Sequence, residues 1–409
     1  MDAAGAVSPL RSNRDFQLLW SGQAVSVIGS RISNIAYPLL VLGVTGSPGA
    51  AGIVGFLGTL PYILFQLPAG AIMDRVDRRR TMIACEAGRA VALASVPAAI
   101  WLGRLSLAHV AVVAFVESTL FVLFRLGETA AVRRVVEPAQ YPQALAQNEG
   151  RVRAANLIGT PLGGVLFDVG RAVPFAADAC SYVVSLVTLL LIRRPFEEER
   201  DVAPRRPVFA EIAEGMAWLW RARFIFATVV LAAASNLLIQ ALILTLIVIA
   251  RQRGASASAT GLILAGFGIG GVLGSLSGAW IQRHVPVRAI VIGAAWTWAA
   301  TVPLVVLLPS LYETLVVLAA ASFVGAGWNV AVNTIYYRLI PDRLIARVSA
   351  VGSLAAFGAL PLGSLTAGVL LQLGGPPLCC AVLAAGMLVL AVAATISPSV
   401  RRGPEPVPA

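Results

Sequence analysis

Residues 70–80 read Gly70-Ala-Ile-Met-Asp74-Arg75-Val-Asp-Arg-Arg-Arg80, at the end of an apolar run over residues 49–72. A related stretch, Gly278-Ala-Trp-Ile-Gln282-Arg283-His-Val-Pro-Val-Arg288, closes another apolar run over residues 258–281. The glycine, the arginine five positions later and the last arginine coincide at an offset of 208 residues (278 − 70). A motif that recurs at this distance, each time at the end of an apolar run, indicates a chain built from two related halves.

A second pair of motifs supports the repeat. Pro161-Leu-Gly-Gly164 recurs as Pro361-Leu-Gly-Ser364, 200 residues further on (361 − 161). The segments ahead of them also match in kind, Arg134-Val-Val-Glu-Pro138 and Arg338-Leu-Ile-Pro341. We therefore expect two six-helix halves related as parallel repeats.

The composition places both halves in a membrane. Apolar residues make up 58% of the chain, charged residues make up 12%, and the mean hydropathy is +0.82. These values exclude a soluble enzyme, a disordered chain, a collagen-like fibre and a disulfide scaffold. Since a spanning helix needs about 20 mostly apolar residues, the predicted fold is all-α and integral to the membrane, with twelve transmembrane helices. The twelve runs are 17–44, 49–72, 82–103, 106–127, 150–170, 173–192, 224–250, 258–281, 287–308, 311–335, 349–373 and 377–397.

The charges predict the orientation. All 31 basic residues are arginine, and with 20 carboxylates the net charge is +11. The arginines lie between apolar runs and form no basic face interleaved with aromatic residues, so no nucleic-acid partner is expected. With the N-terminus inside, the outer loops hold few arginines, which predicts a multi-pass protein of the inner cell membrane with cytoplasmic N- and C-termini. Those outer arginines are Arg104, Arg171, Arg251 and Arg253.

The four cysteines carry no sign of a metal or redox site. They lie inside apolar runs, without the spacing of metal ligands. We therefore expect no metal and no cofactor.

The longest polar interruption, residues 193–223, separates two predicted domains, 1–192 and 224–409. Within this linker, residues 209–220 form an amphipathic helical pattern. Two arrangements stay open, a helix that lies at the membrane interface and a linker helix packed beneath the bundle. The apolar face consists of Phe209, Ile212, Met216, Leu219 and Trp220.

The stretch Gly70-x-x-x-Asp74-Arg75-x-x-Arg78-Arg79-Arg80 resembles the signature of the major facilitator superfamily between its second and third helices. Phe16-Gln-Leu-Leu-Trp-Ser-Gly-Gln23 and Tyr37-Pro-Leu-Leu-Val-Leu-Gly-Val-Thr-Gly-Ser-Pro48 resemble more specifically its macrolide-efflux and enterobactin-exporter branch. The resemblance implies two six-helix bundles and alternating access. We expect a monomer in the lipid bilayer whose partners are a small-molecule substrate and protons.

The resemblance also implies a gate at the end of the second helix, formed by Gly70, Asp74, Arg75 and Arg79. In the family, the matching aspartate ties the two halves together on the cytoplasmic side while the transporter is outward-facing. The second half has Gln282 at the corresponding position, so the two halves are not expected to lock symmetrically.

Ionisable residues deep inside apolar runs are costly and usually face a cavity or a partner. Arg31 lies near the middle of the first run and Glu117 near the middle of the fourth. The resemblance implies that both runs line the central cavity. We expect the two to act either as a proton-coupling switch or as a static structural pair, and Asp178 is the next candidate for coupling.

Two other pairs have the i,i+3 spacing of helix neighbours. Glu86 and Arg89 in the third run are expected to be structural. Arg125 and Glu128 lie near the cytoplasmic end of the fourth run.

Gly159-Thr-Pro161-Leu-Gly163-Gly164 resembles the family's antiporter signature, Gly-Pro-x-x-Gly-Gly, with the proline one place late. Proline and glycine together predict a bendable, tightly packed helix, and ordinary packing of small residues is the alternative. Polar residues on otherwise apolar runs are predicted to line the substrate cavity, although several could equally form hydrogen bonds between helices. These residues are Gln23, Asn34, Asn236, Gln240, Trp328, Asn329 and Asn333.

The sequence thus predicts a proton-driven exporter of a small amphipathic molecule, such as a drug, a secondary metabolite or a siderophore. An importer or facilitator of a small polar solute is the alternative. An enzyme or another non-transport membrane protein is disfavoured, because the chain lacks a concentrated catalytic constellation. Its two histidines, His109 and His284, are expected at opposite membrane faces.

Overall fold

The computed structural model describes residues 9–73, 76–193, 196, 208–308, 310–341 and 344–403, without the side chains of 67–73, 208–212, 311, 337 and 346. All regular structure in these ranges is helical. The first half contains η1 (Leu10–Ser12), α1 (Arg14–Thr45), α2 (Pro48–Met73), α3 (Arg78–Trp101), α4 (Leu107–Val135), η2 (Pro138–Gln140), α5 (Tyr141–Val169) and α6 (Val173–Leu191). The linker helix is α7 (Val208–Arg221), and the second half contains α8 (Arg223–Gln252), α9 (Ala257–His284), α10 (Val287–Leu307), α11 (Leu311–Leu339), α12 (Ile345–Gly358), α13 (Leu360–Ile396) and α14 (Pro398–Arg402).

The apolar runs coincide with the helices, which confirms the predicted fold class. Ten stretches in the described part are long and apolar enough to cross a membrane. One of them, Arg347–Ile396, covers both predicted runs 349–373 and 377–397. The chain turns between these two runs at Gly375, whose φ is 66°. The helix α5 is not among the ten, since polar residues between Gln147 and Arg153 occupy its first half.

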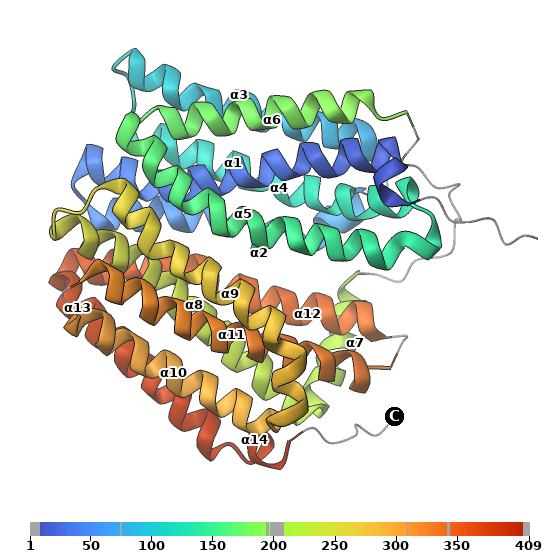
Figure 1. Cartoon of the computed structure of the whole chain (residues 1–409), viewed down its shortest axis with the longest axis vertical. Helices are drawn as coiled ribbons and strands as arrows, with labels where there is room; N and C mark the ends of the chain where they lie inside the picture. Colours follow the sequence, from blue (N-terminus) through green and yellow to red (C-terminus); the bar gives the residue numbers. More distant parts are fainter. Residues whose placement is uncertain are drawn as a thin grey trace, which may run out of the picture.

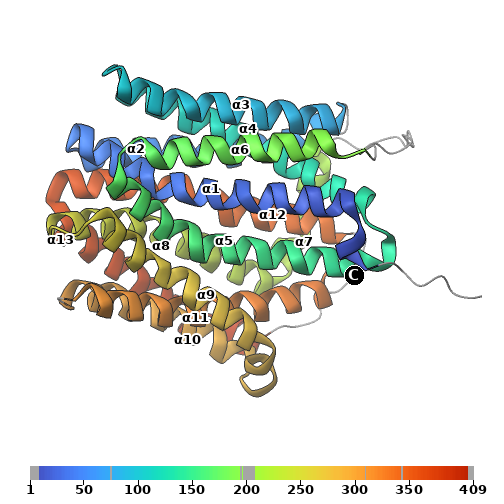
Figure 2. The same ribbon diagram turned by 45° about the horizontal axis from the view of Figure 1, so that its top comes forward.

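The helices form two groups, α1–α6 in one half of the molecule and α8–α13 in the other (Figure 1). In the first group α1 packs against α5 and α6, and α3 packs against α4 and α6. In the second group α8 packs against α13, and α11 packs against α9 and α10. Two pairs of helices form most of the contact between the groups: α5 lies beside α9 (Figure 1, Figure 2), and α2 lies beside α13. We call the end of the molecule that carries α7 the linker end, and the opposite end, where α8 is joined to α9, the distal end.

Small residues allow the two groups to approach closely. A Cβ atom at Gly52 of α2 would lie 2.6 Å from the Cα atom of Gly368 of α13. At Gly164 of α5 it would overlap the carbonyl oxygen of Ala257 of α9. Since lipid tails are as apolar as the helix surfaces, such close backbone contacts are a main source of helix association in a membrane.

The linker helix α7 packs against α12 and α8. Its Trp218 and Leu219 are buried, and Glu214 accepts a 2.5 Å hydrogen bond from Arg347 of α12. The linker helix thus packs on α12 and α8 with one face, while Met216 and Trp220 on its other face are exposed.

Candidate functional site

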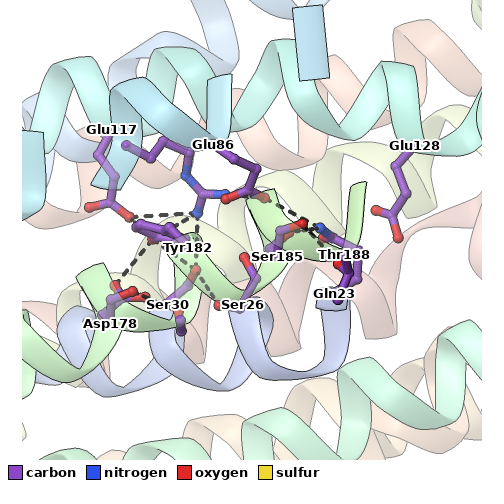
Figure 3. Close-up of polar contacts among 12 residues, drawn as sticks. Gln23, Ser26, Ser30, Glu86, Glu117, Glu128, Asp178, Tyr182, Ser185 and Thr188 are labelled. Atoms are coloured by element: carbon purple, nitrogen blue, oxygen red, sulfur yellow. Dashed lines mark hydrogen bonds and ion pairs between the residues drawn. The ribbon is translucent and has the colours of Figure 1, made fainter. Parts of the chain in front are cut away.

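Four ionisable side chains and one tyrosine meet inside the first group of helices. They are Glu86 and Arg89 of α3, Glu117 of α4, and Asp178 and Tyr182 of α6, and we call them the core charge cluster. Figure 3 labels Glu86, Glu117, Asp178 and Tyr182. Glu86 and Arg89 are three residues apart on α3, and Asp178 and Tyr182 are four residues apart on α6, so each pair lies on one face of its helix. All five are buried, with exposed fractions between 0% and 8%.

Arg89 is the cation of the cluster. Its Nη1 lies 3.6 Å from Glu86 Oε1, and its Nη2 lies 3.8 Å from Glu117 Oε1. Nη2 also donates hydrogen bonds to the hydroxyl of Tyr182 at 2.8 Å and to Ser30 Oγ at 3.1 Å. The guanidinium carbon lies 3.9 Å from the centre of the Tyr182 ring, within the range of a cation–π interaction. Arg89 therefore links α3 to α1, α4 and α6.

Glu117 accepts hydrogen bonds from two tyrosines. Tyr37 of α1 donates to its Oε2 at 2.9 Å, and Tyr182 donates to its Oε1 at 2.6 Å. Asp178 accepts from Ser33 at 2.5 Å and lies 3.1 Å from the same Tyr182 hydroxyl. A single hydroxyl oxygen thus contacts both carboxyl groups.

Glu86 completes the cluster on the side facing the linker end. Gln23 donates to its Oε1 at 3.3 Å and to Ser185 at 2.8 Å. Gln23 is only 3% exposed, so it lies inside the helix group and not on an open wall as expected for a cavity-lining residue. Glu86 Oε2 has no hydrogen-bond partner in the described structure.

The expected partner of Glu117 was Arg31, but the ion pair of Glu117 is with Arg89. Arg31 is partly exposed, and its Nε is buried without a hydrogen-bond partner in the described structure. The stem of Arg31 packs closely against α5, since a Cβ atom at Gly159 would lie 2.5 Å from Arg31 Cβ.

Other residues singled out in the sequence lie at this site. The pair Glu86–Arg89, expected to be structural, forms an ion pair within the cluster, and Asp178, the next candidate for coupling, contacts the same hydroxyl as Glu117. The sequence analysis did not identify Tyr37 and Tyr182. Tyrosines in apolar runs that also contain carboxylates are the signal that could have found them, since a buried phenol needs a hydrogen-bond partner.

The gate predicted at the end of α2 falls partly outside the described residues, because Asp74 and Arg75 lie there. Gly70 is in the last turn of α2. Arg79 donates hydrogen bonds to the carbonyl oxygens of Leu190 and Ile192, at 3.1 and 2.7 Å. It therefore binds the end of α6 within its own helix group.

The glycines of α5 face two different neighbours. Gly159 and Gly163 pack on α1, where a Cβ atom at Gly163 would lie 2.6 Å from the carbonyl oxygen of Ile32. Gly164 packs on α9 of the other group, and Pro161 lies between them inside the helix. The antiporter-like stretch thus lies where α5 meets both groups.

Hydrogen bonds of Asp168, Ser47 and Arg251 join the groups at the distal end. Asp168 of α5 accepts hydrogen bonds from the backbone N–H groups of Ala257 and Ser258, at 2.9 and 2.8 Å, and from the Ser258 hydroxyl at 2.6 Å. Ser47 donates to Gln372 of α13 at 2.9 Å. Arg251 of α8 donates to a backbone carbonyl of α1 at 3.2 Å.

The remaining predicted cavity residues divide into two sets. Asn34, Asn329 and Asn333 are exposed. Asn236 and Gln240 bind neighbouring segments, the carbonyl oxygen of Ala356 at 3.0 Å and Ser364 Oγ at 3.2 Å respectively, and Trp328 packs inside the second group. No group of three or more His, Cys, Asp or Glu side chains that could hold a metal ion occurs in the described part of the chain.

A family profile and related sequences both match this chain. A family profile described as transmembrane secretion effector matches residues 4–404. The multidrug efflux pump Tap of Mycolicibacterium fortuitum is 27% identical over 384 residues, which cover 91% of this chain and 93% of Tap. Macrolide efflux protein A of Streptococcus pyogenes is 25% identical over 213 residues, 52% of this chain and 53% of that protein.

Solved structures share the fold. The nucleoside transporter NupG superposes with a TM-score of 0.73 at 12% identity, over 95% of this chain and 99% of NupG. A bacterial homologue of the iron transporter ferroportin, in an inward-facing state, gives a TM-score of 0.73 at 14% identity, over 93% of this chain and 98% of the homologue.

Proposed function

Because this chain belongs to the major facilitator superfamily, in the family described as transmembrane secretion effectors, we propose that it is a proton-driven exporter of a small amphipathic molecule. It works as a monomer in the inner membrane by alternating access between 1–192 and 224–409, joined by the linker 193–223. The export direction is supported by two relatives that are named as efflux proteins. The match covers 93% of the multidrug efflux pump and 53% of the macrolide efflux protein.

The observation that carries proton coupling is the charge count of the core charge cluster. Three carboxyl groups, Glu86, Glu117 and Asp178, surround the one guanidinium of Arg89. Fully ionised, the cluster would hold a net charge of −2 (1 − 3) at almost no exposure to water, and burying uncompensated charge is very costly. The cluster therefore retains at least one proton.

The geometry indicates where that proton moves. The Tyr182 hydroxyl has one hydrogen, yet its oxygen lies within hydrogen-bond distance of Glu117 and of Asp178. When one carboxyl is ionised and accepts from Tyr182, the other satisfies its contact best by carrying a proton and donating it to the same oxygen. Glu117 lies on α4 and Asp178 on α6. Gain or loss of the proton therefore changes the contacts between these two helices of the first group.

The orientation also forms part of the proposal. The arginine distribution puts the distal end outside and both termini in the cytoplasm. The contacts of Asp168 and Ser47 with the other group then close the outer side in this structure. A cysteine in place of the exposed Arg104 should react with an impermeant thiol reagent added to intact cells, and one in place of the exposed Arg338 should not. Reversed labelling would invert the orientation.

The function is tested in proteoliposomes that contain the purified protein and a trapped pH-sensitive dye. A radiolabelled macrolide, fluorescein and rhodamine 123 serve as probes. The proposal predicts accumulation of a probe against its gradient, driven by an imposed pH gradient, with proton flow opposite to probe flow. Probe equilibration that ignores the pH gradient would favour a facilitator, and flow of both in one direction would favour an importer.

A further inference from the structure

The guanidinium group of Arg89 contacts two aromatic rings. Its carbon lies 3.9 Å from the centre of the Tyr182 ring on α6 and 5.2 Å from the centre of the Phe121 ring on α4. Both distances are within the range of a cation–π interaction. Phe121 lies one turn from Glu117 on the same face of α4. The cation of the core charge cluster is thus in contact with an aromatic side chain that belongs to no proton-binding group.

Phe121 also contacts α2. Its ring centre lies 6.1 Å from that of Tyr62, with 51° between the ring planes, which is a normal geometry for an aromatic pair. The helices α3 and α4 are close together at this level, because a Cβ atom at Gly88 would lie 2.8 Å from Leu120 Cδ1. In such close packing a movement of the Arg89 guanidinium group is passed on to the ring beside it.

The helix α2 can bend at the point where it meets Phe121. Pro61 lies inside α2, directly before Tyr62. A proline inside a helix removes one backbone hydrogen bond and is a common site of bending. Towards the distal end, α2 packs against the other helix group, where a Cβ atom at Gly52 would lie 2.6 Å from Gly368 Cα. A change of the bend at Pro61 therefore changes the contact between the two groups.

The position of the Arg89 guanidinium group depends on the charges around it. Nη1 lies 3.6 Å from Glu86 and Nη2 lies 3.8 Å from Glu117. Direct charge-assisted hydrogen bonds are shorter, about 2.7–2.9 Å, so the guanidinium group is not locked to either carboxyl group. A proton on Glu117 would remove the attraction from α4 and leave that of Glu86. The guanidinium group would then move relative to the Phe121 ring.

Other charged and titratable groups lie on the helices around this contact. They are Arg31 and Tyr37 on α1, Tyr62 on α2, Cys85 and Glu86 on α3, Glu117, Arg125 and Glu128 on α4, Arg151 on α5, and Asp178 and Tyr182 on α6. Glu128, which has the spacing to pair with Arg125, is bound by Arg151 at 2.6 Å instead. The carboxyl groups that form ion pairs with Arg89 are those of Glu86 and Glu117.

We propose that Phe121 transmits the protonation state of the core charge cluster through Tyr62 to the bend of α2. Phe121 is then a positioning residue of the coupling mechanism. Since the carboxyl groups of the cluster are 0% to 8% exposed, protons and substrate are coupled by helix movement and do not compete for one binding site. This role rests on the proposed function, which takes the cluster as the proton-binding site.

The test is the conformational response to pH without substrate and without a gradient. Spin labels are placed at Arg104 and Tyr312, which are exposed at the distal end on opposite halves, after replacement of the exposed Cys180. Distance distributions are measured for the purified protein in lipid nanodiscs over a range of pH. In the wild type, the ratio of the states open and closed at the distal end should shift about three- to tenfold, the size that one cation–π contact and one aromatic pair can transmit.

Two variants interrupt the route at different points. Phe121→Leu removes the ring between Arg89 and Tyr62 and should reduce the shift to less than about twofold. Tyr62→Leu leaves the contact of Arg89 with Phe121 in place, removes the aromatic partner on α2 and should reduce the shift to the same extent. Phe121→Tyr keeps the ring and should retain the wild-type response.

The chain offers a matched control. Phe115 of α4 and Phe65 of α2 form a second aromatic pair between the same helices, with ring centres 6.3 Å apart. Phe115 is two residues from Glu117 and therefore lies on a different face of α4. Phe115→Leu removes an aromatic contact of the same kind and should respond to pH like the wild type.

A wild-type response in Phe121→Leu or in Tyr62→Leu would overturn the proposed route, and so would a wild-type protein that does not respond to pH. A loss in Phe115→Leu as large as that in Phe121→Leu would also overturn it, because general packing of α2 on α4 would then explain both. Proton-driven transport is judged separately by the proteoliposome test. The expected pH responses without pH-driven transport would reject the proposed function alone, whereas pH-driven transport with an unchanged response of Phe121→Leu would reject only the role of Phe121.

Discussion

Glu117 and Asp178 contact the same atom, the hydroxyl oxygen of Tyr182, at 2.6 and 3.1 Å. Two carboxyl groups that share one hydroxyl are linked through it, because a substitution at either changes the hydrogen bonding of the other. The linked pair has distinct ends. Tyr37 of α1 binds Glu117, and Ser33 of α1 binds Asp178. Substitutions at the two ends therefore test different parts of the proposed coupling.

Glu117→Gln should separate binding from coupling. The amide has nearly the shape of the protonated acid: its oxygen can accept from one tyrosine and its NH2 group can donate to the hydroxyl oxygen of the other, but it cannot release a proton. In proteoliposomes the variant should exchange substrate down a gradient and lose at least about tenfold in pH-driven accumulation. Tyr37→Phe, which removes one hydrogen bond to Glu117 and no titratable acid, is the matched control and should keep pH-driven accumulation. Full accumulation by Glu117→Gln would exclude Glu117 as the coupling acid.

Asp178→Asn should also uncouple transport if the two acids act through Tyr182. Asp178 is 0% exposed and accepts from Ser33 and Ser181, at 2.5 and 3.0 Å, so an asparagine oxygen can replace much of its local bonding. The informative measurement is the number of protons moved per substrate in each single variant and in the double variant with Glu117→Gln. A shared unit predicts that the double variant is no worse than either single one. Additive losses would indicate two independent proton sites.

Arg89→Met should destabilise the protein more than any carboxyl substitution in the cluster. Removal of the one cation leaves three buried carboxyl groups without charge compensation, and breaking a buried ion pair costs about 3–5 kcal/mol. The expected result is a clearly lower Tm in detergent. Adding Glu86→Gln to this variant should recover part of the loss, because Glu86 lies 3.6 Å from Arg89 and would otherwise stay ionisable. A wild-type Tm for Arg89→Met would show that Arg89 does not hold the cluster together.

The helices themselves could be predicted from the sequence, because the length of an apolar run and the residues that end it are local properties of the chain. Gly46 illustrates this. It ends α1 with a φ of 65°, and Pro48 begins α2 two residues later. Such ends follow from the conformational freedom of glycine and the fixed φ of proline, and they need no knowledge of the rest of the chain.

The pairing inside the candidate site could not be predicted in the same way. Arg31 and Arg89 are both arginines inside apolar runs, and the choice of partner for Glu117 depends on how α1, α3 and α4 are rotated about their axes. That rotation follows from packing, for example from the contact of Gly159 with the stem of Arg31. The sequence correctly marked Glu86, Glu117 and Asp178 as ionisable groups inside apolar runs, but it could not show that they meet.

Closure of the distal end depends on a carboxylate at the end of one helix and the first turn of another. The first amides of α9 have no partners within the helix. Ser256 accepts from one of them, that of Ala259, and Asp168 of α5 accepts those of Ala257 and Ser258. The contact joins the two halves directly, and the positive end of the α9 dipole favours the negative charge of Asp168.

Asp168→Asn should therefore shift the conformational equilibrium toward the state open at the distal end. The amide keeps one acceptor oxygen, loses the charge and turns its NH2 group toward a donor that Asp168 accepts, so we expect a shift of about three- to tenfold in the ratio of the two states. Ser258→Ala removes the 2.6 Å hydroxyl contact with Asp168, and with it the 2.8 Å contact of that hydroxyl with Ser256, and should shift the ratio less. The ratio can be measured from distance distributions between spin labels at Arg104 and Tyr312, both exposed at the distal end on opposite halves, after replacement of the exposed Cys180. If Asp168→Asn gives the wild-type distribution, the backbone contacts of α5 with α9 and of α2 with α13 suffice for closure, and Asp168 only caps α9.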